Sequence, residues 1–242
     1  RSHMKKFRDY DITIKFLEEY KQAAIKNAEE LLNDAKILLK QKSFARAYFL
    51  SVASIEETGK AYTAFFSRGR NLRDPGLKSK LQKLFEDHSH KIASAFIAWI
   101  FASSDPRKAA TSAVAYMIDL GQGRETSMYV DASPDGSISM PSKIARPDAV
   151  IEAIRIADNC LSHTKKHIDV NLPAITSSFD DKMLCIGTDK LKKVYEQKDF
   201  WEFLLAELKI DVSVSTYSRV MVTYYENYLS KGKLFTTKSV SE

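Results

Sequence analysis

A histidine and a lysine three residues apart are the first residues whose types suggest chemistry. His88 and Lys91 lie in residues 77–103, where the spacing of apolar residues predicts one helix with His88 near the middle of its apolar face and Lys91 at the edge. A single histidine that faces a core is more often a satisfied packing residue than a catalyst. Two bases beside other charged groups shift pKa values, and they suit either proton transfer or a structural ion-pair network.

A second charged group interrupts the most apolar stretch of the chain, residues 43–66. Its apolar residues recur at helical spacing on one face, and the opposite side is apolar too, as in a helix that is buried nearly all round. Four charges break this pattern, and both glutamates lie within ion-pair reach of the lysine. Buried ions cost several kcal/mol each unless they are paired, so this helix is expected to meet charged groups in the core. The four charged residues are Arg46, Glu56, Glu57 and Lys60.

The end of another helix adds an arginine to these candidates. An Asp-Pro pair at 105–106 is typical of a helix start. If that helix continues through Gly121 and Gly123, Arg124 faces inward, and Tyr129 can approach from the same end. We expect Glu57 and Lys60 to be mostly buried, with polar partners from another helix such as His88 or Lys91. The candidate catalytic residues are therefore His88, Lys91, Glu57, Lys60 and Arg124.

No motif predicts a metal or a cofactor. His163 and His167 have the spacing of a metal-binding pair, but they fall on the polar face of their helix and have no evident third ligand. Cys160 and Cys185 match neither a metal pattern nor a disulfide framework. The sequence has no phosphate-binding loop, nucleophile elbow or dinucleotide fingerprint.

The elements that must position these residues are helices. Amphipathic or apolar spacing predicts helices over 13–41, 43–66, 77–103, 106–124 and 146–168. Residues 127–141 are expected to form a short hairpin or ordered loop, and 171–189 an irregular segment before helices near 199–208 and 213–230. We therefore predict an all-α protein. An antiparallel four- or five-helix bundle spans 10–170, and a C-terminal helical extension (171–242) packs on it.

Composition supports a helical protein in a reducing compartment. The chain has 242 residues, of which 44% are hydrophobic, with only 8 glycines and 6 prolines. Residues 1–4 look like an expression scar. The charges within 43–66 argue against a membrane span, so a cytoplasmic location is expected. The net charge of +6 is compatible with RNA or an acidic partner. If a second copy of the chain covers one face of the apolar helix at 43–66, the protein is a homodimer, and we expect this arrangement.

Three ordered motifs resemble those of the abortive-infection AbiV family of HEPN-type helical domains. They are ARAYFLSVASIEETGKAYTAFF, then DHSHK, then RETSMYVDASPDGSISMP. The resemblance covers roughly residues 25–170. The family pattern has an EE-x-GK helix, an H-x-x-K helix and a Y-V-D segment before a proline. The matching residues are Glu56, Glu57, Gly59 and Lys60; His88 and Lys91; and Tyr129, Val130 and Asp131. By this resemblance Glu56, Tyr129 and Asp131 are candidate binding residues.

The resemblance implies phage defence by growth arrest through translation shut-off, with RNA, the translation machinery or a phage-derived protein as partner. HEPN relatives are often metal-independent RNases with an arginine four to six residues before a histidine. Here no arginine has that spacing, and Lys83 stands where it would precede His88. Lysine lacks the bidentate fork of arginine. Three interpretations stay open. The first is an RNase with a rearranged site, and the second is a non-catalytic module that sequesters a partner and whose buried charges are structural. The third, a nucleotide or small-ligand pocket in the bundle, has no motif behind it.

Overall fold

The computed structural model describes residues 10–132, 135–208 and 214–236 of the chain. Within these ranges the regular structure is helical apart from one two-stranded hairpin, so the predicted all-α class is confirmed. The chain divides into two compact units. One combines the chain up to Arg68 with Gln82–Pro173, and the other combines Gly69–Leu81 with the chain from Ala174 onward.

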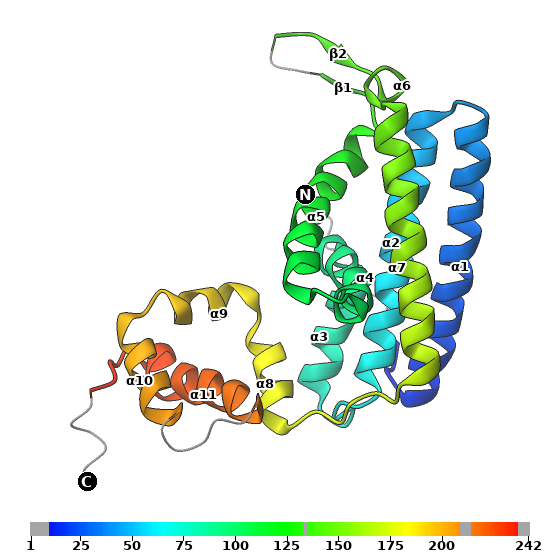
Figure 1. Ribbon diagram of the computed structural model, residues 1–242. Helices are drawn as coiled ribbons and strands as arrows, with labels where there is room; N and C mark the ends of the chain where they lie inside the picture. The colour runs from blue at the N-terminus through cyan, green and yellow to red at the C-terminus, as the bar shows by residue number, and fades with distance from the viewer. Residues whose placement is uncertain (1–9, 133–134, 209–213, 237–242) are drawn as a thin grey trace. The chain divides into compact units, whose positions relative to one another are not determined.

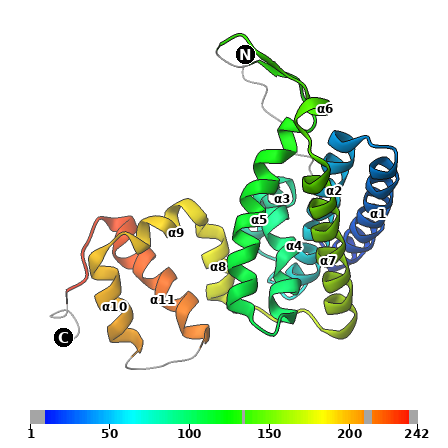
Figure 2. The same ribbon diagram turned by 45° about the horizontal axis from the view of Figure 1, so that its top comes forward.

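The first unit is a bundle organised around one central helix. Its helices are α1 (Ile14–Lys40), α2 (Phe44–Ser67), α4 (His88–Ala102), α5 (Pro106–Thr126), α6 (Pro141–Ile144) and α7 (Pro147–Val170). Figures 1 and 2 show α1, α2 and α7 as long rods side by side, with α4 and α5 alongside them. Helix α2 contacts α1, α4, α5 and α7. It is therefore the helix that the apolar sequence predicts to be buried on most sides.

The core of the bundle comes from the faces that these helices turn toward α2. Val52 and Ile55 of α2 are fully buried, and Phe96 of α4 and Val150 of α7 are buried in the same cluster. Each fully buried side chain of this size contributes about 1.5–3 kcal/mol relative to an exposed one. None of the helices in the described ranges has the length and apolarity needed to cross a bilayer.

The prediction of one helix over 77–103 was wrong, because two helices meet at Asp87. Helix α3 (Pro75–Glu86) ends there, and the Asp87 carboxylate accepts a hydrogen bond from the His90 N–H at 2.8 Å, which caps α4. The apolar pattern continues across this break, and periodicity alone therefore hid it. As a consequence, His88 is the first residue of α4 rather than a residue at the middle of a helix.

The expected hairpin within 127–141 is present. Strand β1 (Asp131–Ala132) pairs antiparallel with β2 (Ile138–Ser139). Gly136 in the connection has φ = +81°, a conformation that favours glycine. Pro134, which belonged to the expected turn, lies outside the described residues.

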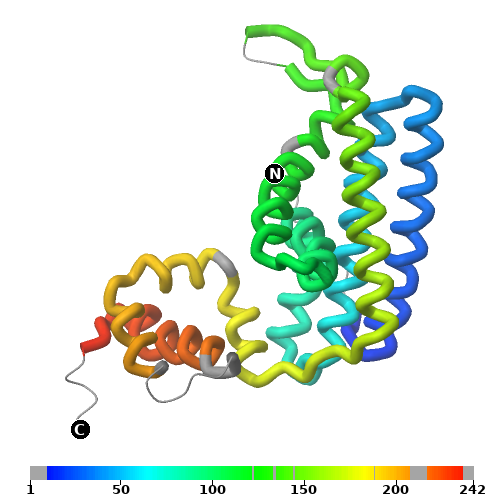
Figure 3. Tube along the Cα trace, in the orientation of Figure 1, coloured from blue at the N-terminus to red at the C-terminus, as the bar shows by residue number. Residues whose placement is uncertain are grey.

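The second unit is a small helical assembly of its own, whose trace from α8 to α11 can be followed in Figure 3. Its helices are α8 (Ser178–Ile186), α9 (Thr188–Tyr195), α10 (Lys198–Leu208) and α11 (Val214–Asn227), followed by a 3-10 turn, η1 (Leu229–Lys231). The predicted irregular segment 171–189 is confirmed for 171–177 and wrong beyond, since a capping box between Ser177 and Asp180 starts α8. Its core is aromatic: Tyr224 packs against Phe200, Phe203 and Tyr228.

Candidate functional site

The carboxylate of Glu56 lies at the centre of a cluster of basic side chains. Only 8% of this side chain is exposed, and both of its oxygens are occupied. Oε2 lies 2.8 Å from Nδ1 of His88 and 2.9 Å from Nζ of Lys91, and Oε1 lies 2.8 Å from Nε of Arg124. One carboxylate therefore faces two permanent cations and one histidine. We call these four residues the Glu56 cluster.

Three helices supply the Glu56 cluster, and each is held there by a local feature of the sequence. Glu56 belongs to α2, His88 and Lys91 to the first turn of α4, and Arg124 to the last turn of α5. The cap at Asp87 starts α4 at a point that gives both of its basic residues access to Glu56. Helix α5 continues to Thr126, as it must if Arg124 is to face inward.

Two glycines let the neighbouring helices approach α2 closely. A Cβ atom on Gly59 would lie 1.7 Å from the backbone oxygen of Lys91, which no real structure tolerates. A Cβ atom on Gly123 would lie 2.4 Å from the hydroxyl oxygen of Tyr48. Glycine at these two positions therefore places α4 and α5 near enough for their basic side chains to reach one carboxylate.

The charges around Glu56 decide its ionisation. Burial by itself would raise the pKa of this carboxyl, but hydrogen bonds from Lys91 and His88, together with their charges, hold the pKa below its usual value of 4.5. Glu56 is therefore ionised at neutral pH. Breaking such a buried pair by removal of one partner typically costs about 3–5 kcal/mol, because the other charge stays buried without compensation.

His88 is the member of the cluster that solvent reaches most readily. Its side chain is 53% exposed, and the contact with Glu56 uses Nδ1. No hydrogen bond to Nε2 occurs among the described residues, so this nitrogen is available to a ligand or to water. A carboxylate that holds one imidazole nitrogen fixes the ring and its tautomer, as in catalytic dyads and triads.

Lys91 and Arg124 differ in what they can reach. Lys91 is 7% exposed and donates to a buried oxygen, so it can neutralise and position Glu56 but offers little surface to a ligand. Arg124 is 22% exposed, contacts Glu56 through Nε and stands 5.9 Å from the ring centre of Phe49. The guanidinium group is thus the second side chain, after His88, that an anion could contact.

Glu57 and Lys60, which were expected to meet basic groups of another helix, pair with each other instead. Their charged atoms are 2.5 Å apart, and the side chains are 17% and 21% exposed. The inward carboxylate is the preceding residue, Glu56. A helix that is apolar nearly all round does not reveal which of two adjacent glutamates faces a given neighbour. The available signal was Gly59, one turn after Glu56 on the same face, since a glycine within a helix often marks a close helix contact.

The candidate binding residues of the hairpin lie apart from this centre. Tyr129 is exposed, and the Asp131 carboxylate accepts a hydrogen bond from the Ala132 N–H. No described contact joins either residue to the Glu56 cluster. Lys83 is exposed, as its position off the apolar stripe predicts.

The other three histidines of the described ranges pack against other side chains. His163 stacks on Trp99, and His167 contacts the rings of Tyr62 and Phe65, so the two do not lie on a solvated face as their spacing suggested. His90 contacts the hydroxyls of Thr63 and Ser94. No group of three or more His, Cys, Asp or Glu side chains in the described ranges is arranged to hold a metal ion.

Comparison with known families identifies this architecture. The model of the AbiV family (HEPN_AbiV) matches residues 16–162, more than half of the chain. This range contains all four residues of the Glu56 cluster, and the chain belongs to this family. Neither the curated proteins nor the solved structures contain a significant match.

Proposed function

We propose that this member of the AbiV family is an abortive-infection effector, and that it cleaves RNA through the Glu56 cluster. The single observation that carries the proposal is the geometry of His88. Its ring is half exposed, its Nδ1 is held by a buried carboxylate, and its Nε2 is open. Lys91 and Arg124 pair with the same carboxylate, so the cluster has a net positive charge that attracts phosphate.

The chemistry requires groups that the chain supplies and one water molecule. Nε2 of His88 takes the proton of a ribose 2′-hydroxyl, and the freed oxygen attacks the adjacent phosphorus. The bond to the 5′-oxygen breaks, and that oxygen gains its proton from water. The products are a 2′,3′-cyclic phosphate and a 5′-hydroxyl. Arg124 stabilises the charge that develops on the phosphoryl oxygens, and Glu56 stabilises the imidazolium.

One observation favours a second candidate, a non-catalytic module that sequesters RNA or a protein partner. Both oxygens of Glu56 are already occupied by protein groups, and Lys91 is buried. Such a saturated network could serve only to hold α2, α4 and α5 together. In that case, His88 and Arg124 would contribute positive surface but no proton transfer.

Incubation of the purified protein with total RNA, with and without EDTA, separates these candidates. We expect cleavage that EDTA does not suppress and that His88→Gln abolishes, because glutamine keeps the hydrogen-bonding capacity of histidine but does not titrate near neutral pH. His90→Gln is the matched control, since His90 is two residues away on α4 and contacts Thr63 and Ser94 rather than Glu56.

Three results would count against catalysis by this cluster. They are equal loss of activity in the two variants, unchanged cleavage by His88→Gln, and no cleavage by the wild-type protein under any condition. The last result, together with RNA retention in a binding assay, would favour the sequestering module.

A further inference from the structure

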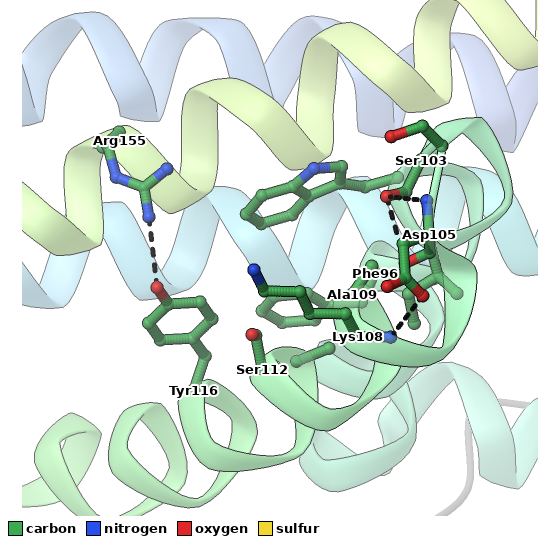
Figure 4. Close-up of a pocket in the computed structure, with 12 residues that line it drawn as sticks. Phe96, Ser103, Asp105, Lys108, Ala109, Ser112, Tyr116 and Arg155 are labelled. Carbon is green, nitrogen blue, oxygen red and sulfur yellow. Dashed lines mark hydrogen bonds between the residues drawn. The ribbon is translucent and has the colours of Figure 1, made fainter.

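A pocket lies at the opposite end of α4 and α5 from the Glu56 cluster. It is a pocket of about 470 Å³, and α4, α5 and α7 supply its walls (Figure 4). A volume of this size is typical of pockets for small organic ligands, which span about 300–1,000 Å³. Lys91 and Trp99 are eight residues apart on α4, which separates the two sites by about 12 Å along that helix.

The aromatic walls of the pocket have nearly parallel planes. The rings of Trp99 and Phe96 lie at 18° to each other, and those of Phe96 and Tyr116 at 14°. The hydroxyl of Tyr116 accepts a hydrogen bond from Arg155 at 3.3 Å, which fixes that ring. Phe96 is fully buried and its ring contacts both of the others, so a guest meets only the half-exposed rings of Trp99 and Tyr116. These two rings favour an aromatic guest, because ring pairs gain from edge-to-face as well as from offset-stacked contact.

Three charged side chains line the pocket: Asp105, Lys108 and Arg155. Arg155 already pairs with Glu152, so its charge is balanced. The Asp105 carboxylate is engaged as the cap of α5. Lys108 is exposed and has no ion-pair partner within the described part of the chain. Figure 4 shows its side chain extending over Ser112 toward Tyr116.

We propose that this pocket binds a nucleotide unit, that is, one flat base and one phosphate. The base would pack against the half-exposed rings of Trp99 and Tyr116, and the phosphate would pair with Lys108. A free nucleoside monophosphate and one link of a single-stranded RNA share this chemistry. The pocket and the Glu56 cluster use different residues, so failure of this proposal would leave RNA cleavage by His88 untouched.

Intrinsic tryptophan fluorescence gives a direct test. The chain has two tryptophans, and Trp201 lies in the second unit, so the full-length Trp201→Phe protein reports on Trp99 alone. Adenosine monophosphate and a short oligoadenylate are titrated in parallel, and isothermal titration calorimetry measures the same binding. We expect quenching that saturates with at least one of the two probes, and the probe that binds identifies the source of the nucleotide.

Charge variants of neighbouring residues show whether the pocket is responsible. Lys108→Gln should weaken binding about tenfold, as expected for loss of one charge-assisted hydrogen bond. Arg107→Gln removes the same charge from the adjacent residue, which is exposed and does not line the pocket, and should change binding less than twofold. Ser112→Tyr should fill the space and abolish binding. Equal weakening by the two charge variants, unchanged binding in Ser112→Tyr, or no signal with either probe in both measurements would overturn the proposal.

Discussion

Each unit of the protein contains a buried carboxylate with several donors, and the two differ in what surrounds them. Asp181 of α8 receives Arg70 at 2.8 Å, the Thr176 hydroxyl at 2.9 Å and the Asn71 N–H at 3.1 Å. Its donors are a backbone amide, a hydroxyl and an arginine that is 10% exposed. Glu56 receives two cations and a histidine that is 53% exposed.

The difference separates a structural carboxylate from one suited to chemistry. The donors of Asp181 attach the segment Gly69–Leu81 to α8, and the only basic side chain among them is closed to solvent. The donors of Glu56 include a group that can exchange protons near neutral pH and that solvent reaches. Burial with full pairing is thus common to both sites, whereas access to a titratable group distinguishes the Glu56 cluster.

Removal of either carboxylate should produce the largest effects. We expect Glu56→Ala to lower the free energy of unfolding by about 4 kcal/mol, because it leaves Lys91 buried without a partner and removes the ion pair of the partly exposed Arg124. Asp181→Ala should cost about 3 kcal/mol, since it leaves one cation and two neutral donors. Urea unfolding followed by circular dichroism measures both. A loss below 1 kcal/mol for Glu56→Ala would show that the cluster does not stabilise the bundle.

Gly59→Ala should destabilise the bundle by about 3 kcal/mol, because the added methyl group forces α4 away from α2 at Lys91. Gly121→Ala is the matched control. A Cβ atom on Gly121 would contact nothing within 4 Å, and alanine should there raise stability by about 0.5–1 kcal/mol through its higher helix propensity. Thermal unfolding of the two variants measures both effects. Similar behaviour of the two would contradict the close approach of α4 at Gly59.

The contribution of Glu56 to the free energy of unfolding should decrease on acidification. Its folded-state pKa is lowered, so its stabilisation is complete above the usual carboxyl value of 4.5 and is lost as the pH falls through the folded-state pKa. The stability difference between wild type and Glu56→Gln should therefore shrink as the pH falls below 4.5. Urea unfolding at pH values above and below 4.5 measures it. A difference that grows on acidification would reverse the proposed sign.

Glu57→Ala should have the smallest effect, about 0.5–1 kcal/mol. Glu57 pairs only with Lys60 of its own helix in the described contacts, and Lys60 is exposed enough to be hydrated after the change. Parallel urea unfolding of Glu57→Ala and Glu56→Ala compares the two adjacent glutamates. Equal losses would assign both to the same buried network.

The sequence predicted the helices whose apolar faces determine their packing. Residues 43–66 and 146–168 correspond closely to α2 (Phe44–Ser67) and α7 (Pro147–Val170). Composition alone did not locate two boundaries, because each depends on a single capping side chain within a helical pattern. Asp87 separates α3 from α4, and Ser177 starts α8.

The site could be predicted in part. His88, Lys91 and Arg124 were expected to meet a carboxylate of the central helix, and the structure brings all three together around Glu56. Glu57 was chosen from its position on a helical wheel, without knowledge of which helices pack on each side. Which glutamate is inward depends on where α4 and α5 pack. Gly59 and Gly123 mark those packing positions because they allow close helix contacts, and a pattern of polar and apolar residues does not show such contacts.

The central claim is that His88, held by Glu56, performs the proposed RNA cleavage. Growth arrest per folded molecule, measured in cells that express wild type, His88→Gln or Glu57→Gln, tests this claim most directly. The account predicts that His88→Gln abolishes arrest while the folded fraction stays near that of wild type, and that Glu57→Gln retains arrest. Full arrest by folded His88→Gln would contradict it.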